Sequence, residues 1–360
     1  MTDDVYYRLR DLLDSLPHGF PPSSDGLEIR ILKKIFTREE AAIAVRMKLK
    51  YENAAAMAAR TGVDEEYLKV ILPRMANQGQ IFGVTVGGIP IYRLAPFVFG
   101  IYEWQLHRLD RELVEMVREY FERDFGIEFY SHKPSLLRVV PIEENITAGS
   151  EVRPYESLRR MIEKAGSWAV GECVCKKEKR ILGQGCDKPL EVCLAIAPIE
   201  NVFDNHFWGT AITRDRALDI LKSADDAGLV HLTSNTRDGN IFICNCCGCC
   251  CSILRGINDL GQMDCVARSH FIAAVDADRC TACGACRARC QVRAIDMEDR
   301  ASVNDRCIGC GLCVLRCPEG ALRLLRRDPG DREFIPRDER DWMRKRAASR
   351  KRDDYKSLLK

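Results

Sequence analysis

Residues 280–290 read CTACGACRARC, and residues 307–318 read CIGCGLCVLRCP, with the same cysteine spacing. Each stretch carries three cysteines at two-residue intervals and a fourth after three further residues, and the second stretch begins 27 residues after the first. The repeat extends beyond the cysteines, because Asp278-Arg279 matches Asp305-Arg306. Three thiolates at this spacing let a tightly curled loop present its sulfurs to one metal centre, while the fourth leads to another centre. The two stretches therefore predict a compact domain with two interlocked metal sites.

The whole chain of 360 residues contains 19 cysteines, and all of them lie at or after Cys173. A secreted disulfide framework is the main rival to thiolate–metal binding. The first residues, Met1 to Val5, lack the basic and apolar regions of a secretory signal, and no stretch is long and apolar enough to cross a membrane. Neighbouring cysteines such as those at 249–251 rarely satisfy disulfide geometry. We therefore expect a cytoplasmic, metal-binding protein without membrane insertion.

The repeated motif resembles the bacterial ferredoxins that carry two [4Fe–4S] clusters, over roughly residues 271–326. The resemblance implies the following ligands: cluster I takes Cys280, Cys283, Cys286 and Cys317, and cluster II takes Cys307, Cys310, Cys313 and Cys290. The family has a proline after the fourth cysteine of each motif. In this sequence Pro318 follows Cys317 as in the family, but Gln291 follows Cys290 in place of the proline. This difference removes no cluster ligand. Structural zinc, the alternative, usually needs two separated cysteine pairs.

The remaining 11 cysteines form two blocks and one isolated residue, Cys265. The first block contains Cys173, Cys175, Cys186 and Cys193, and the second contains Cys244, Cys246, Cys247, Cys249, Cys250 and Cys251. We expect the first block to be able to ligate one cluster. The second is too dense for one cubane, so we expect it to share a site with the first block and to supply another. A helix over 213–227 and a strand over 229–232 would bring the blocks together.

These blocks predict at least one further iron–sulfur cluster, with a zinc site or a redox-active thiol reservoir as alternatives. Residues 166–270 followed by the repeated motif resemble larger ferredoxin-type proteins of anaerobic microbes. The triplet Cys246-Cys247-Gly248 is also similar to the cysteine–cysteine–glycine domains of heterodisulfide-reductase-type subunits. Those domains need a second, distant C-x2-C element that we do not identify in this sequence.

The segment 27–95 has the element order of a winged helix-turn-helix. Thr37 and Glu40 form a capping box, Asp64 caps a later helix, and Gly87-Gly88 joins two short β-prone runs. The helix that would enter a DNA groove begins with Asp64, Glu65 and Glu66, which oppose phosphate binding. The chain as a whole carries a net charge of only +2. A protein-docking module is therefore the favoured interpretation, with DNA as the alternative partner.

The fold class that follows is α+β and multidomain. The expected segments are an N-terminal arm (1–26), a winged-helix-like domain (27–95), a helical connector (96–165), a cysteine-rich α/β metal-binding domain (166–270), a two-cluster ferredoxin domain (271–326) and a charged tail (327–360). Within the connector we expect one helix over 102–125. The tail is nearly all polar apart from Trp342, so we expect it to be a solvated helix or frayed.

Our interpretation is an electron-transfer iron–sulfur protein with two [4Fe–4S] clusters and at least one further cluster, which exchanges electrons with a partner oxidoreductase. This interpretation favours an electron carrier or an oxidoreductase subunit over a stand-alone enzyme. It assigns no catalytic residue. No glycine-rich nucleotide-binding motif is present. Two alternatives remain: a redox- or iron-responsive winged-helix transcription regulator, and a reductase subunit with an unusual cluster in the cysteine-rich domain.

Overall fold

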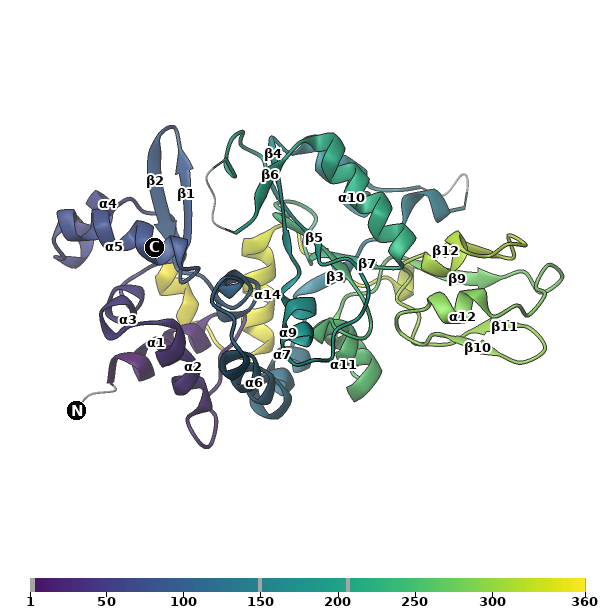
Figure 1. Ribbon diagram of the computed structural model, residues 1–360, viewed down its shortest axis with the longest axis horizontal. Helices are drawn as coiled ribbons and strands as arrows, with labels where there is room; N and C mark the ends of the chain where they lie inside the picture. Colours follow the sequence, from purple (N-terminus) through teal and green to yellow (C-terminus); the bar gives the residue numbers. More distant parts are fainter. Residues whose placement is uncertain (1–3, 148–150, 205–207, 360) are drawn as a thin grey trace. The chain divides into compact units, whose positions relative to one another are not determined.

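The computed structural model describes residues 4–147, 151–204 and 208–359 (Figure 1). The chain forms two compact units. The first comprises residues 1–132, 204–208 and 343–360, and the second comprises residues 133–203 and 209–342. Helices and sheets are mixed, which confirms the broad fold class. Among the described helices, none combines the length and the apolar character that a membrane span requires.

The first unit begins with five helices and a β-hairpin. They are α1 (Asp4–Ser15), α2 (Leu27–Ile35), α3 (Arg38–Ala44), α4 (Ala54–Thr61), α5 (Glu65–Asn77), β1 (Phe82–Val86) and β2 (Ile89–Arg93). The expected local signals are confirmed: Thr37 and Glu40 form the capping box of α3, and the Asp64 side chain accepts a hydrogen bond from the Tyr67 N–H at the start of α5. The strands β1 and β2 are antiparallel and are joined by Gly87-Gly88.

The expected single helix over 102–125 is wrong. The structure has short turns at Phe97–Ile101 and Glu103–Gln105, and then α6 (Arg111–Tyr120), a looser turn (Phe121–Phe125) and α7 (Gly126–Ser131). The helix restarts because the Asp110 carboxylate accepts a hydrogen bond from the Leu113 N–H and caps α6. Aromatic rings of Phe20, Phe97, Tyr120 and Phe125 then pack together in the core.

The charged tail is not solvated as expected. It forms α14 (Glu339–Ser349) and a last turn (Asp354–Leu359). The Arg346 side chain is fully buried and donates hydrogen bonds to the carbonyl groups of Pro17, Phe129 and His132. Composition could not reveal this burial, because a guanidinium with five donors can be buried wherever backbone carbonyls converge on it.

The second unit is built on a six-stranded sheet in the order β3-β7-β8-β5-β4-β6. Its strands, all paired antiparallel, are β3 (Leu137–Val139), β4 (Ser167–Glu172), β5 (Glu191–Ala197), β6 (Thr210–Ile212), β7 (Val230–Ser234) and β8 (Phe242–Cys246). The expected helix and strand between the cysteine blocks are confirmed as α10 (Arg214–Ala227) and β7.

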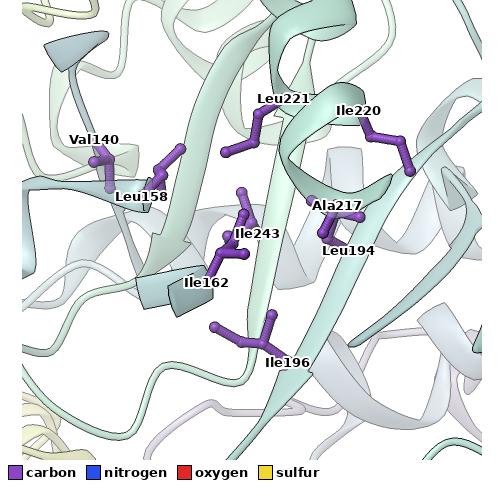
Figure 2. Close-up of a cluster of buried hydrophobic side chains, with 9 residues drawn as sticks. All are labelled: Val140, Leu158, Ile162, Leu194, Ile196, Ala217, Ile220, Leu221 and Ile243. Atoms are coloured by element: carbon purple, nitrogen blue, oxygen red, sulfur yellow. The ribbon is translucent and has the colours of Figure 1, made fainter. Parts of the chain in front are cut away.

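One face of this sheet carries a hydrophobic core (Figure 2). Leu194 and Ile196 of β5 and Ile243 of β8 pack against α10 and α8 (Leu158–Lys164). Side chains alternate along a strand, so Cys193, Cys244 and Cys246 belong to the opposite face. Along the chain, α9 (Val174–Ile181) follows β4, and α11 (Ser252–Leu260) follows β8. The alternation thus keeps these three cysteines out of the core in Figure 2, while a second buried cluster packs Cys173, Cys247 and Cys250 with Val192, Ala224 and Leu229.

The last part of the second unit contains the repeated cysteine motif. It comprises β9 (Phe271–Val275), α12 (Ala285–Arg289), β10 (Ile295–Met297), β11 (Ala301–Val303), α13 (Leu312–Leu315) and β12 (Leu322–Arg326). Strand β9 pairs with β12, and β10 pairs with β11. The first and last strands of the segment are therefore joined, which closes it into a small module.

A buried carboxylate ties this module to the preceding chain. The Glu156 side chain is 4% exposed and lies 2.6 Å from the Arg326 guanidinium and 2.9 Å from His270 Nδ1. Burial opposes its ionisation, but the interactions with His270 and Arg326 outweigh burial and lower the pKa of Glu156 to about 2. Its negative charge therefore stabilises the folded state.

We predict that Glu156→Gln destabilises the protein by on the order of 3 kcal/mol at pH 7. Because the folded pKa of about 2 lies below the ordinary value of 4.5, the carboxylate's contribution is complete above about pH 4.5 and disappears as the pH falls toward 2. Chemical unfolding at several pH values should therefore show a difference between wild type and variant that shrinks in acid. The exposed Glu298→Gln is the matched control, and an equal effect from both changes would contradict the prediction.

Candidate metal centres

The first cysteine motif surrounds a pocket. Four of the residues that line this pocket are cysteines, namely Cys280, Cys283, Cys286 and Cys317. The rest of the lining is largely apolar, with Ala285, Ala301 and Leu322 among its members. Cys283 is exposed, whereas Cys286 is buried. The structure thus brings the fourth cysteine of the second motif to the three leading cysteines of the first. We call this arrangement site I.

Site II comprises Cys290, Cys307, Cys310 and Cys313. Burial raises the pKa of Cys310 to about 12, and the nearby Cys290 and Cys307 contribute to that rise. Burial also raises the pKa of Cys313, with Cys310, Cys307 and Cys290 as the next contributors. Burial raises the pKa of Cys290 as well, so these three thiols need a nearby positive charge before they become thiolates. An iron–sulfur core supplies this charge.

Backbone N–H groups point at the sulfurs of both sites. The Ala294 N–H donates to Cys290 Sγ at 3.2 Å, and the equivalent Ala321 N–H donates to Cys317 Sγ at 3.1 Å. The Ala301 N–H donates to Cys280 Sγ at 3.4 Å. Such hydrogen bonds stabilise negative charge on ligand sulfurs and tune the reduction potential of a bound cluster. The donor set, the apolar lining and these N–H groups all fit [4Fe–4S] clusters.

Six of the other cysteines form what we call the six-thiol ring: Cys173, Cys175, Cys193, Cys244, Cys246 and Cys251. Each thiol shifts the pKa of two neighbours, in the circular order 173, 175, 251, 246, 244, 193. The neighbouring thiols of Cys175 and, after it, Cys246 raise the pKa of Cys251. The ring collects sulfurs from both blocks, as the two-block interpretation expected.

A buried cation lies beside this ring. The Lys176 side chain is 2% exposed, and its ammonium group donates a hydrogen bond to the Asn245 carbonyl at 3.1 Å. Burial works against its charge, but attraction to Cys173, Cys246 and other thiols raises the pKa of Lys176. The thiols are therefore the groups that favour the charged form of this buried ammonium.

A polar chain holds the ring strands in register. Asn245 is fully buried; its amide group donates to the Val192 carbonyl at 2.6 Å, and its Oδ1 lies 2.6 Å from His231 Nδ1. On its other side, His231 Nε2 lies 2.7 Å from the Asp225 carboxylate. These contacts link α10, β7, β8 and β5. They fix the strand positions that carry Cys193, Cys244 and Cys246.

The remaining four cysteines of the two blocks form a tighter group, which we call the four-thiol site: Cys186, Cys247, Cys249 and Cys250. All their Sγ atoms lie within 4.8 Å of one another. Cys186 Sγ is 3.6 Å from Cys250 Sγ and 3.9 Å from Cys247 Sγ. The structure therefore separates Cys186 from the other cysteines of the first block. Cys265 belongs to neither group, because its buried thiol donates to the Ile253 carbonyl at 3.0 Å.

The four-thiol site and site II are joined by one close contact. The Gly248 N–H donates to Gln291 Oε1 at 2.8 Å, and the Asn258 amide donates to the carbonyl groups of Gly248 and Gln291. A Cβ atom on Gly248 would lie only 2.1 Å from the Gln291 carbonyl oxygen. Gln291 follows the site II cysteine Cys290, and Gly248 separates two cysteines of the four-thiol site. We call this contact the Gln291–Gly248 joint.

Two equivalent arginines support the joint. Arg289 donates to the carbonyl groups of Asp225 and Asp226 at the end of α10. Arg316, 27 residues later in the repeat, donates to Asp226 at 3.4 Å. Each arginine directly precedes the fourth cysteine of its motif. The C-terminal end of a helix carries partial negative charge, so both guanidinium groups lie where cations are favoured.

Comparison with known proteins identifies one segment. A family model described as a 4Fe-4S dicluster domain matches residues 272–332. These residues therefore form a ferredoxin-type iron–sulfur segment, as the cysteine spacing predicted. The search of curated proteins found no match for the chain. The search of solved structures found none either.

Sequence reasoning located the cysteines but missed their supporting residues. The sequence contained a sign that Gln291 is special, because this residue stands where the motif predicts a proline. Lys176 also had a weak signal, since it directly follows Cys175. The Asp225–His231–Asn245 chain had none, because its members come from three elements whose pairing is set by the sheet.

We predict that Gly248→Ala breaks the Gln291–Gly248 joint and destabilises the second unit by about 3 kcal/mol, because the new Cβ would overlap a backbone oxygen. Hydrogen exchange should increase at residues 289–294 and 247–251. Gly330→Ala is the matched control, since a Cβ there meets no atom within 4 Å, and its effect should stay within about 0.5 kcal/mol. Unchanged exchange at both segments in Gly248→Ala would show that the joint is not formed.

Proposed function

We propose that this protein is an iron–sulfur electron carrier that passes electrons between sites I and II and a further cluster in the six-thiol ring, to or from a partner oxidoreductase. The observation that carries this proposal is the Gln291–Gly248 joint. It places the residue after a site II cysteine in direct backbone contact with the cysteine-rich segment. A ferredoxin-type module that served only as a separate carrier would not need this contact.

The chain's own residues provide three things for such a role. Thiolates of sites I and II would hold [4Fe–4S] clusters, which accept and release single electrons when bound. The N–H groups of Ala294, Ala301 and Ala321 stabilise added negative charge at the sulfurs. Lys176 provides a buried positive charge beside the six-thiol ring.

Site I is the end from which electrons would be exchanged with a partner. Its Cys283 is exposed, and Cys280 and Cys317 are partly exposed. In site II, Cys307 and Cys313 are buried, and the module surface near Cys290 is occupied by the joint. A partner protein can therefore approach site I more closely than site II, and electron transfer requires such approach.

The first unit is proposed as the protein-docking module of this carrier, with a winged-helix-like order in α2 to β2. Charge on α5 argues against the DNA-binding regulator. Lys69 forms ion pairs with Glu65 and Glu66, and Arg74 pairs with Glu39. Cations already neutralised in this way release few counterions from DNA, so they add little affinity for a phosphate backbone.

We predict that the anaerobically purified protein contains clearly more than about eight irons per chain, the content of two cubanes. Cys317→Ala should remove iron from site I, and Cys244→Ala should remove iron from the six-thiol ring while the signals of reduced cubanes persist in electron paramagnetic resonance spectra. Cys265→Ala is the matched control and should keep full iron and sulfide. A wild-type content of eight irons that Cys244→Ala does not lower would refute the further cluster.

We also predict that the loaded protein binds duplex DNA no better than a neutral protein does. Fluorescence anisotropy with a pool of random duplexes should stay flat at physiological salt. Tight binding with a steep salt dependence, abolished when iron is removed, would instead support the regulator.

A further inference from the structure

The four-thiol site differs from the other cysteine groups in the spacing of its sulfurs. Three sulfur pairs are separated by 3.6, 3.8 and 3.9 Å. A single tetrahedral Zn²⁺ with Zn–S bonds of about 2.3 Å requires sulfur–sulfur separations of about 3.8 Å. These three separations, which involve all four sulfurs, match thiolates that share one ion, and every sulfur pair in the group lies within 4.8 Å.

A cubane needs a wider arrangement, because each of its four thiolates binds a different iron and the whole core lies between them. The other cysteine groups of this protein can be compared with the four-thiol site. Among the described His, Cys, Asp and Glu residues, the four-thiol site is the only group with three or more ligand atoms within 4.8 Å of one another. The sulfurs of sites I and II, and those of the six-thiol ring, do not gather as closely.

Local chain geometry explains how four sulfurs converge here. Cys247, Cys249 and Cys250 come from the turn between β8 and α11, which is closed by a hydrogen bond from the Cys251 N–H to the Cys247 carbonyl at 3.1 Å. Cys186 comes from the loop after α9, and the neighbouring Lys188 fastens that loop by donating to the Ala227 carbonyl at 2.6 Å. Two separate segments are thus brought to one point.

We propose that Cys186, Cys247, Cys249 and Cys250 bind one Zn²⁺ ion as a tetrahedral thiolate site, separate from the iron–sulfur clusters. The ion holds the turn that presents Gly248 to Gln291, so the site acts as a structural clamp on the Gln291–Gly248 joint. Closed sites with four protein ligands are typical of structural zinc. This proposal does not depend on electron transfer, since it concerns only how the turn is held.

The test uses the full-length protein, produced with iron and Zn²⁺ supplied and purified anaerobically. We expect one zinc per chain, with a zinc-edge X-ray absorption spectrum showing four sulfur neighbours at about 2.3 Å. Cys186→Ala and Cys250→Ala should each lose most of this zinc but retain the acid-labile sulfide. They should also increase hydrogen exchange at residues 289–294, as loss of the clamp predicts.

Cys175→Ala, in the six-thiol ring, and Cys265→Ala are the matched controls and should keep the zinc. A wild-type protein that binds no zinc, or a Cys250→Ala variant that loses sulfide together with iron, would overturn the proposal. Two of the four thiols found joined as a disulfide under anaerobic conditions would also overturn it. None of these results would decide whether sites I and II transfer electrons, so the two proposals fail separately.

Discussion

The close approach of Gly248 to the backbone of Gln291 is the constraint on which the second unit depends. A hydrogen bond of 2.8 Å and a separation that excludes any Cβ atom bring the ferredoxin-type segment against the cysteine-rich segment. The Glu156 carboxylate, with Arg326 and His270, fastens the same module elsewhere. The module is therefore held at several points, and its position relative to the cysteines of the sheet follows from specific polar contacts.

Sulfur spacing and charge compensation distinguish the cysteine groups from one another. The four-thiol site is compact enough for one ion, whereas sites I and II have wider sulfur sets with backbone N–H donors. The six-thiol ring has a buried ammonium group beside it. Thiolates gathered in a protein interior repel one another, so each group needs its own source of positive charge. That requirement explains why cations and N–H groups accompany the cysteines.

Local signals in the sequence predicted local structure well. The Thr37–Glu40 capping box, the Gly87-Gly88 turn and the α10–β7 pair depend on neighbouring residues, so they are visible in a single sequence. The repeated motif likewise predicted the segment that the dicluster family model matches. The grouping of Cys186 with Cys250 and the burial of Arg346 depend on residues far apart in the chain. Only the folded arrangement of strands and helices sets those distances.

The internal repeat of the module has a geometric consequence. The two motifs, 27 residues apart, give the module two similar halves. Arg289 and Arg316, which occupy equivalent positions in these halves, both donate hydrogen bonds to the carbonyl group of Asp226 at the end of α10. Gln291 has an amide oxygen for the Gly248 N–H, whereas its counterpart Pro318 does not. Gln291 thus distinguishes the two halves of the repeat, and its contact, together with those of Glu156, keeps site II beside the four-thiol site.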